Sequence, residues 1–296
     1  WTADETGLAL VDSFCRAVQR GVEVRLIFDS FYQSMSDHVA LEQLRDCGVT
    51  VLGFYPIGGW LKVADEVRRI ERVHEKIFIV DGRVAIMGGR NVNNHYFGQG
   101  QWFDYDVILE GPAARSMQAI FLKQWDQFVV WEREANCPQQ KKRGYFCPSI
   151  DEPVRSTMSR YFPPVESQSG VSTVRSIYSD PRTQSDSAGH ILHAALFRMA
   201  KTSIQIENAY LIPSRRLREA LLEAARRGVQ VDIITNSKES NDVASLWYAS
   251  ANFYKMFAQG NVHVREILGT QTIHSKTVLI DGRWGLVGSF NLCGHS

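Results

Sequence analysis

The chain has 296 residues, of which 44% are apolar and 22% are charged, and its formal net charge at pH 7 is +1. This is enough apolar material for one large buried core or for two domains of ordinary size. The near-zero charge gives no global basic surplus for nucleic acid and no acidic excess typical of disorder. No apolar run approaches the ~20 residues that a membrane-spanning helix needs. Composition therefore excludes a membrane-embedded bundle and predicts a globular chain of two units.

The five cysteines are too few and too scattered to indicate a disulfide framework or a zinc site. Cys137 and Cys147 are the pair for which a disulfide is conceivable. Reduced thiols fit a cytoplasmic setting better, so we expect this pair to be reduced.

Helices and strands alternate along the first part of the chain. The pattern predicts helices over residues 7–19 and 39–46, strands over 22–28 and 49–54, and later a strand over 105–110 and a helix over 113–129. Residues 132–170 are rich in Pro, Gln, Ser and charged side chains, which indicates an irregular connection with little packed core.

The second part of the chain shows a similar alternation. The pattern predicts strands over residues 202–211, 229–235, 262–266 and 276–280, and helices over 215–227 and 249–258. Leu217, Leu221 and Ala224 recur at helical spacing within the first of these helices. Such alternation predicts an α/β fold in which helices cover both faces of a sheet.

An internal repeat connects the two parts. Residues 74–91 and 274–291 align without gaps and are identical at seven of eighteen positions. Residues 20–30 and 227–237 match at six of eleven positions. Coincidence would supply about one identity over eighteen positions, given average residue usage. The chain is therefore expected to be a duplicated α/β domain.

The repeat also sets the expected boundaries. The first repeat, the irregular connection and the second repeat are expected over residues 1–131, 132–170 and 171–296. The strand at 202–211 has a first-repeat counterpart that would lie before residue 1, and the helix at 113–129 has no second-repeat counterpart. We therefore expect the natural protein to extend past both ends of this sequence.

Each copy of the repeated motif brings together side chains that suit a phosphate group. His74 and Lys76 are two positions apart and so share one face of a strand. A two-residue Asp-Gly turn further on would place His74 opposite Gly89, with Asn91 just beyond. The second copy offers the same set in His274, Lys276, Ser289 and Asn291. An imidazole, an ammonium and an amide beside a small residue leave room for phosphate, bind its oxygens and supply a group that attacks phosphorus or moves a proton.

Four other polar residues are expected to be structural. Asp81 and Asp281 have the opposite strand parity and lie in turns, where we expect them to bond to the turn backbone. His190 and His193 have a helical spacing that could bind a metal, but one helix alone gives an incomplete site. We therefore expect this pair to be packed or half-exposed.

Two such half-sites are expected to form one composite site on an approximate two-fold axis. Two facing histidines allow covalent catalysis in two steps, in which one attacks phosphorus and the other protonates the departing alkoxide. Lys76 and Lys276 would neutralise the phosphate charge, so the sequence predicts no cofactor and no metal.

At these residues the sequence resembles the phospholipase D superfamily, whose signature H-x-K-x4-D-x6-G-[GS]-x-N both copies satisfy. Gly88-Gly89-Arg90-Asn91, Tyr96-Phe97-Gly98 and Asp104-Tyr105-Asp106-Val107 are similar to the bacterial cardiolipin synthase branch. The resemblance implies two phospholipase D-like α/β/α sandwich repeats related by a pseudo-two-fold axis, with the active site at their interface.

The resemblance also implies a reaction. Phosphatidylglycerol, with a second phosphatidylglycerol or with phosphatidylethanolamine, would give cardiolipin through a phosphatidyl-histidine. By family analogy His74 is the nucleophile and His274 the general acid/base. A carboxylate on a later strand would orient the first histidine, for which Asp106 or Asp104 fits, and the equivalent in the second copy would lie beyond Ser296.

The expected partners follow from this chemistry. They are the phospholipid substrates and a membrane surface, with no nucleic acid, and the expected location is the cytoplasmic face of a bacterial inner membrane. The basic triplet at residues 141–143 and the apolar segment at 54–61 are candidate lipid contacts. The alternatives are a phosphodiesterase that hydrolyses phospholipids, a nuclease, and an inactive binding or scaffold module.

Overall fold

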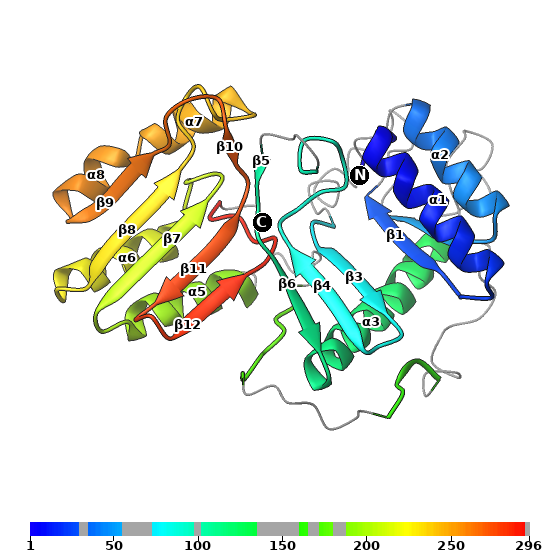
Figure 1. The fold of residues 1–296 in the computed structure, drawn as a ribbon. Coiled ribbons are helices and arrows are strands. Elements are labelled where there is room, and N and C mark those ends of the chain that lie inside the picture. Colours follow the sequence, from blue (N-terminus) through cyan, green and yellow to red (C-terminus); the bar gives the residue numbers. More distant parts are fainter. Residues whose placement is uncertain are drawn as a thin grey trace.

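The structure is a computed structural model that describes residues 1–29, 35–54, 73–97, 102–134, 160–164, 172–179 and 188–293. Two α/β units lie side by side, and the two copies of the motif face each other where the units meet (Figure 1). Residues 55–61 and the basic triplet at 141–143, both proposed above as lipid contacts, lie outside the described residues.

The second repeat is built on one five-stranded sheet. Its strand order is β12-β11-β7-β8-β9, with β7, β8 and β9 parallel and β11 antiparallel to both neighbours. The strands are β7 (Ser203–Asn208), β8 (Gln230–Thr235), β9 (Val262–Glu266), β11 (Lys276–Ile280) and β12 (Trp284–Val287). The predicted strands all form, within a few residues of the expected ends.

Helices α5 (Ala188–Met199) and α6 (Arg215–Arg226) pack on this sheet. Leu217, Leu221 and Ala224 are fully buried, as their spacing predicts, and the Ser214 side chain caps α6 by accepting from the Leu217 N–H. The single helix predicted over 249–258 is two helices, α7 (Ala244–Ala251) and α8 (Tyr254–Gln259).

The first repeat has the same kinds of element arranged in two smaller sheets. β1 (Arg25–Asp29) and β2 (Thr50–Phe54) form a parallel pair, and β3 (Lys76–Val80), β4 (Val84–Gly88) and β6 (Asp106–Glu110) form an antiparallel sheet. The helices are α1 (Glu5–Gln19), α2 (Met35–Asp46) and α3 (Pro112–Glu134). α3 buries Trp125 and Phe128 against Leu52 of β2 and Met117 against Ala85 of β4.

The sheet of the first repeat is split because one strand of the second repeat has no described counterpart there. In the second repeat β7 lies between β11, which carries the motif lysine, and β8. β3 and β1 correspond to β11 and β8 by the sequence repeat. Among the described residues no strand takes the place of β7 between β1 and β3, so the first repeat divides into a two-stranded and a three-stranded sheet.

The motif hairpins differ from the expected register by one residue. Lys76 pairs with Gly88 and Val80 with Val84, so three residues rather than two form the turn. Asp81 (φ 53°) and Gly82 (φ 62°) both adopt left-handed backbone, and Arg83 N–H closes the turn on the Val80 carbonyl at 3.0 Å. The Asp-Gly pair therefore marks the turn correctly but does not fix its length.

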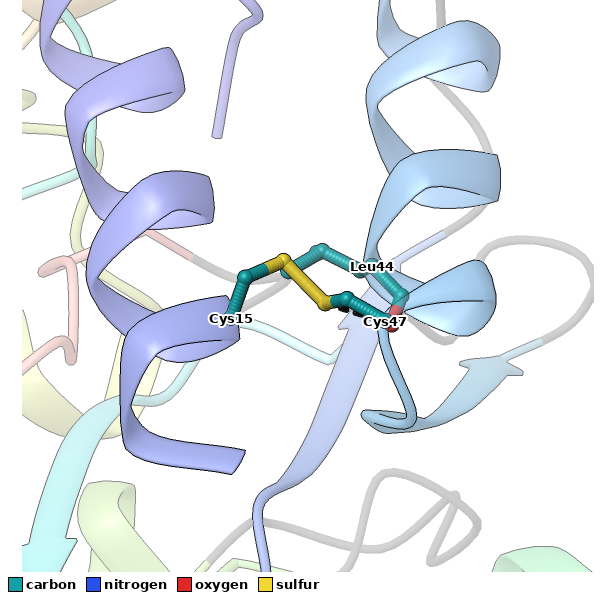
Figure 2. Close-up of a disulfide and its surroundings, with 3 residues drawn as sticks. All are labelled: Cys15, Leu44 and Cys47. Carbon is teal, nitrogen blue, oxygen red and sulfur yellow. Dashed lines mark hydrogen bonds between the residues drawn. A yellow bond between two sulfur atoms is a disulfide. The ribbon is translucent and has the colours of Figure 1, made fainter. Parts of the chain in front are cut away.

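A disulfide joins the two outer helices of the first repeat. Cys15 on α1 is bonded to Cys47, which follows α2, with a Cα–Cα distance of 5.5 Å (Figure 2). Closing a chain segment of this length stabilises the fold by about 3–4 kcal/mol, mainly by restricting the unfolded chain. The scattered cysteines of the sequence do not indicate this disulfide, because the helix packing that brings the two sulfurs together is not visible in the sequence.

A short parallel ladder links the repeats. β5 (Trp102–Phe103) of the first repeat pairs with β10 (Thr272–Ile273) of the second, and the His274 N–H donates to the Phe103 carbonyl at 2.7 Å. The two strands run beside each other at the centre of Figure 1. This ladder places the second motif histidine against the first repeat. No helix among the described residues is long and apolar enough to cross a bilayer.

Candidate active site at the repeat interface

The first half-site lies at the start of β3. His74 immediately precedes the strand, and the Lys76 ammonium curls back to donate to the His74 carbonyl at 2.5 Å. Burial lowers the pKa of Lys76 to about 8. The pKa of His74 lies well below its ordinary value, first because of the Lys76 charge and then because of burial. The imidazole is therefore neutral and able to act as a nucleophile.

The second half-site repeats this arrangement at the start of β11. His274 and Lys276 are each 5% exposed, and Lys276 Nζ lies 2.8 Å from His274 Nδ1 and also donates to the His274 carbonyl. Burial lowers the pKa of Lys276 to about 7 and is the largest influence lowering the pKa of His274. Two buried lysines of low pKa next to two imidazoles form a site prepared for an anion.

The two half-sites contact each other. His74 Nδ1 lies 2.9 Å from the carbonyl oxygen of Ser289, although the residues are 215 positions apart. The charges of Lys276 and His274 also contribute to the lowered pKa of His74. The structure thus brings the two motifs into one site, which the sequence predicts from the duplication.

The carboxylate beside a motif histidine is Asp104. Its Oδ2 lies 2.8 Å from His274 Nδ1, and its side chain is fully buried. This corrects the prediction that Asp106 or Asp104 orients His74, because Asp104 contacts the histidine of the other repeat and, among the described residues, Asp106 hydrogen-bonds to neither histidine. A carboxylate only accepts, so this hydrogen bond requires the hydrogen to be on Nδ1, which leaves Nε2 as the nitrogen available for proton transfer.

Asp106 has a different partner. Its Oδ2 accepts from Arg90 Nε at 2.6 Å. The other guanidinium nitrogens of Arg90 donate to the carbonyls of Tyr96 at 2.7 Å and Asp104 at 2.8 Å. Arg90 thus holds together three points of the segment that carries the Asp104 carboxylate.

Gly89 serves this arrangement. A Cβ at Gly89 would lie 2.6 Å from Asp104 Oδ1, and one at Gly88 would lie 2.1 Å from Asp106 Oδ1. From the sequence, the small residue at Gly89 is expected to leave room for substrate. The structure shows that the space is taken by the carboxylate of Asp104, which could not approach a larger residue.

Aromatic rings surround His274. Trp102 stacks over its imidazole with the ring centres 5.6 Å apart, and Tyr96 and Tyr210 approach edge-on at 5.2 and 6.4 Å. The Asn91 side chain donates to the Tyr96 hydroxyl at 3.2 Å. Nothing in the sequence indicates Trp102 or Tyr210 as site residues, because neither belongs to the repeated motif and both lie against His274 only after folding.

The remaining motif residues occupy the expected region. Asn291 is 7% exposed and lies two residues after Ser289, whose carbonyl contacts His74. Asp281 accepts from the backbone N–H groups of Lys201, Thr202 and Ser203 at 2.8–3.1 Å, which lower the pKa of its carboxyl. It therefore ties its turn to the start of β7 and lies away from the imidazoles, whereas Asp81 is exposed in its turn.

His190 and His193 are packed, as predicted. His193 stacks on Phe290 with the ring centres 4.6 Å apart, and His190 meets the same ring edge-on at 4.9 Å. Burial lowers the pKa of His193 to about 4. Among the described residues no group of three or more His, Cys, Asp or Glu side chains is arranged to hold a metal ion.

This fold and site define a class of protein. Along 99% of its length the chain matches the crystal structure of phosphatidylserine synthase from Haemophilus influenzae Rd KW20, with a TM-score of 0.65, 18% identity and 71% of that chain covered. This likeness shows that the two chains share a fold.

The sequence also identifies a family, which is a narrower group than the proteins that share this fold. The family described as "Cardiolipin synthase, PLD-like domain" matches residues 5–125 and 194–296, and the chain belongs to it. It is 26% identical to cardiolipin synthase of Geobacillus kaustophilus, over 98% of this chain and 53% of that protein. It is also 26% identical to cardiolipin synthase C of Escherichia coli K12, over 98% of this chain and 71% of that protein. The chain thus spans about half the length of the Geobacillus relative.

Proposed function

We propose that the protein is a phosphatidyltransferase that makes cardiolipin from phosphatidylglycerol, with phosphatidylglycerol or phosphatidylethanolamine as the second lipid. The observation that carries this proposal is the meeting of two histidine-lysine pairs across the repeat interface. The pKa of each imidazole lies below its ordinary value, and the Nδ1 of each contacts an oxygen of the other repeat. The family membership and the cardiolipin synthase relatives support the same assignment.

The first chemical step transfers the phosphatidyl group to the protein. His74 donates Nδ1–H to the Ser289 carbonyl, which leaves the lone pair of Nε2 to attack phosphorus. A P–N bond forms while the phosphodiester P–O bond to the head group breaks. His274 enters this step in its protonated form, which its carboxylate partner Asp104 stabilises, and gives the proton on Nε2 to the departing alkoxide, so that the ring becomes neutral.

The second step regenerates the protein. The hydroxyl of the acceptor lipid gives its proton to His274 and attacks phosphorus, and the P–N bond to His74 breaks. Lys76 and Lys276 neutralise the phosphate in both steps, because an anion beside a buried lysine raises its pKa and keeps the ammonium charged. Charge neutralisation by side chains is the reason to propose a metal-independent reaction.

The product profile of the full chain tests the proposal. The protein is incubated with vesicles containing phosphatidylglycerol, and lipids are separated and weighed by mass spectrometry. Cardiolipin and free glycerol in equal amounts support the transferase. Phosphatidic acid without cardiolipin would show a hydrolase, and cleavage of single-stranded DNA with no lipid turnover would show a nuclease. Lipid binding without any turnover would show a binding module.

We further propose that the protein works at a membrane surface, since its substrates reside there. The sequence favours the cytoplasmic face, but the Cys15–Cys47 disulfide supports the opposite side, because disulfides persist in oxidising compartments. We therefore place the protein on the oxidising side of the membrane. Recovery of the intact disulfide from cells whose thiols are alkylated at lysis tests this placement, and alkylated Cys15 and Cys47 would return it to the cytoplasmic face.

A further inference from the structure

Arg90 and Phe290 occupy the same position in the two motifs, directly before the motif asparagine. The family signature leaves this position open. We infer that both are positioning residues, and that each one holds the histidine of the opposite repeat in its reactive orientation. Only the kinetic consequence of this inference rests on the proposed function; the contacts that carry it do not.

Arg90 acts on His274 through Asp104. Its three guanidinium nitrogens donate to Asp106 Oδ2, the Tyr96 carbonyl and the Asp104 carbonyl, at 2.6–2.8 Å. These bonds fix the backbone of Asp104, whose Oδ2 lies 2.8 Å from His274 Nδ1. The planar guanidinium carries five N–H donors in a fixed fork, so the Arg90 side chain can satisfy three separate acceptors at once.

Phe290 acts on His74 through its neighbour Ser289. The Phe290 ring is enclosed by His193 and His190 of α5, and a Cβ on Gly189 would lie 2.6 Å from the ring. The helix therefore approaches this ring as closely as a glycine allows. With the ring fixed, the carbonyl of the preceding Ser289 is fixed as well, at 2.9 Å from His74 Nδ1.

The backbone after Phe290 is also anchored. Asn208, at the end of β7, donates to the Phe290 carbonyl at 3.4 Å and accepts from the Leu292 N–H at 3.1 Å. Leu292 is fully buried. The segment that presents Ser289 is thus held by the ring on one side and by Asn208 on the other. The ring contact is the one that a side-chain substitution can release without breaking the backbone bonds.

The two supports are opposite in chemistry. An ion-pair and hydrogen-bond cluster holds the carboxylate for His274, whereas an apolar contact with two imidazoles holds the carbonyl for His74. The charged groups that influence His274 are Asp104, Lys276 and Lys76, and those that influence His74 are Lys76, Lys276 and His274. The path of contacts from Arg90 to His274 passes through Asp104, whose carbonyl accepts from Arg90 and whose Oδ2 contacts His274 Nδ1.

The role inferred for Arg90 is tested by the titration of His274. Histidine is labelled with 13C at Cε1, the eight histidine signals are followed by NMR against pH, and His274→Gln identifies its signal. Arg90→Gln should lower the pKa of His274, because loss of a fixed Asp104 removes an influence that raises it. Arg198→Gln, which removes the exposed ion pair with Glu223, is the matched control and should leave this titration unchanged. An unchanged His274 titration in Arg90→Gln would overturn the role inferred for Arg90.

The role inferred for Phe290 is tested by the titration of His74, whose signal is identified with His74→Gln. Phe290→Leu should change this curve, whereas Phe257→Leu, in the core of the same repeat, should reduce stability without changing it. Gly189→Ala should reproduce the effect by displacing the unaltered ring. Gly285→Ala is its control, since a Cβ there meets nothing within 4 Å. Equal titration curves of His74 in Phe290→Leu and Phe257→Leu would overturn the role inferred for Phe290.

Kinetics separate positioning from a general loss of structure. If each residue positions a histidine, kcat should fall about tenfold or more while KM changes little, because the lost contacts matter in the transition state. A rise in KM at constant kcat would overturn the inference. If the vesicle assay shows no transferase activity while both titrations shift as expected, the proposed function fails and the positioning stands.

Discussion

Asp104 of the first repeat and His274 of the second are in hydrogen-bond contact, Oδ2 to Nδ1, at 2.8 Å. The contact is reciprocated by His74 Nδ1 and the Ser289 carbonyl at 2.9 Å. Each motif histidine is therefore oriented by an oxygen of the other repeat. Because neither orientation exists in an isolated repeat, the duplication is a condition for the proposed chemistry and not only a record of how the fold arose.

The Asp104 contact predicts that Asp104→Asn lowers kcat by about 10- to 100-fold. The amide cannot stabilise the protonated ring, so the pKa of His274 falls and the alkaline limb of the kcat profile moves to lower pH. Asp106→Asn weakens the Arg90 cluster and leaves the carboxylate of Asp104 in place, so its loss should be smaller. Initial rates between pH 5 and 9 measure both effects. A larger loss in Asp106→Asn would return that residue to the role predicted from the sequence.

The two-histidine scheme predicts that His74→Ala and His274→Ala each lower turnover by at least about 10³-fold. With a phosphodiester whose leaving group needs no protonation, such as a nitrophenyl ester, His274→Ala should accumulate a phosphohistidine at His74. Peptide mass spectrometry on samples kept out of acid detects the adduct. His263→Ala, at an exposed histidine on β9, is the control and should retain its activity. Near-normal activity in either motif variant contradicts the scheme.

The sequence predicts the motif residues of the site better than the contacts that orient them. The histidines, lysines and asparagines were identifiable because the duplication shows them twice, with constant spacing. The pairing of Asp104 with His274 was not, since that carboxylate is 170 positions from its partner and neighbours another aspartate. Strand parity alone cannot decide between Asp104 and Asp106, as both lie on the same face of an extended segment.

The fold shows the same division between local and distant information. Strands such as β8 and helices such as α6 followed from periodicity, because their burial pattern is local. The hairpin register depended on the backbone conformation of Asp81 and Gly82, which permits both two- and three-residue turns. The disulfide depended on how α1 packs against α2. These features are set by tertiary contacts that a single sequence does not display.

The buried lysines predict that the free energy of unfolding rises with pH between about 7 and 10 in the absence of substrate. The pKa values of Lys276 and Lys76 are lowered to about 7 and about 8 in the folded protein, so in this range the unfolded chain binds more protons. Urea titrations at several pH values measure the slope. Lys276→Met should flatten it, whereas Lys201→Met, at an exposed lysine, should not. Equal slopes in the two variants would show that Lys276 titrates normally.

Charge neutralisation by lysine predicts that a divalent-metal chelator leaves the reaction unchanged. The rate of cardiolipin formation is compared before and after dialysis against EDTA, with the vesicles prepared in metal-free buffer. Lys76→Ala and Lys276→Ala should both reduce kcat/KM strongly, because each removes a donor and a charge from the phosphate. Loss of activity on dialysis that is restored by Mg²⁺ or Ca²⁺ would contradict the metal-independent mechanism.

The Cys15–Cys47 bond predicts a stability difference that is separate from catalysis. Replacing both cysteines by serine should lower the free energy of unfolding by about 3–4 kcal/mol, because the unfolded chain regains the entropy of an open segment. Cys293→Ser, at a cysteine outside this disulfide, is the control for loss of a thiol. Without reduction, digestion should yield two peptides joined through Cys15 and Cys47.

The N-terminal part of α1 also contacts the segment after the first motif, where Thr6 Oγ1 donates to Asn94 at 2.8 Å. Loosening α1 should therefore reduce kcat at temperatures where the fold is still intact, and unchanged kcat together with the expected loss of stability would confine the disulfide to a stabilising role.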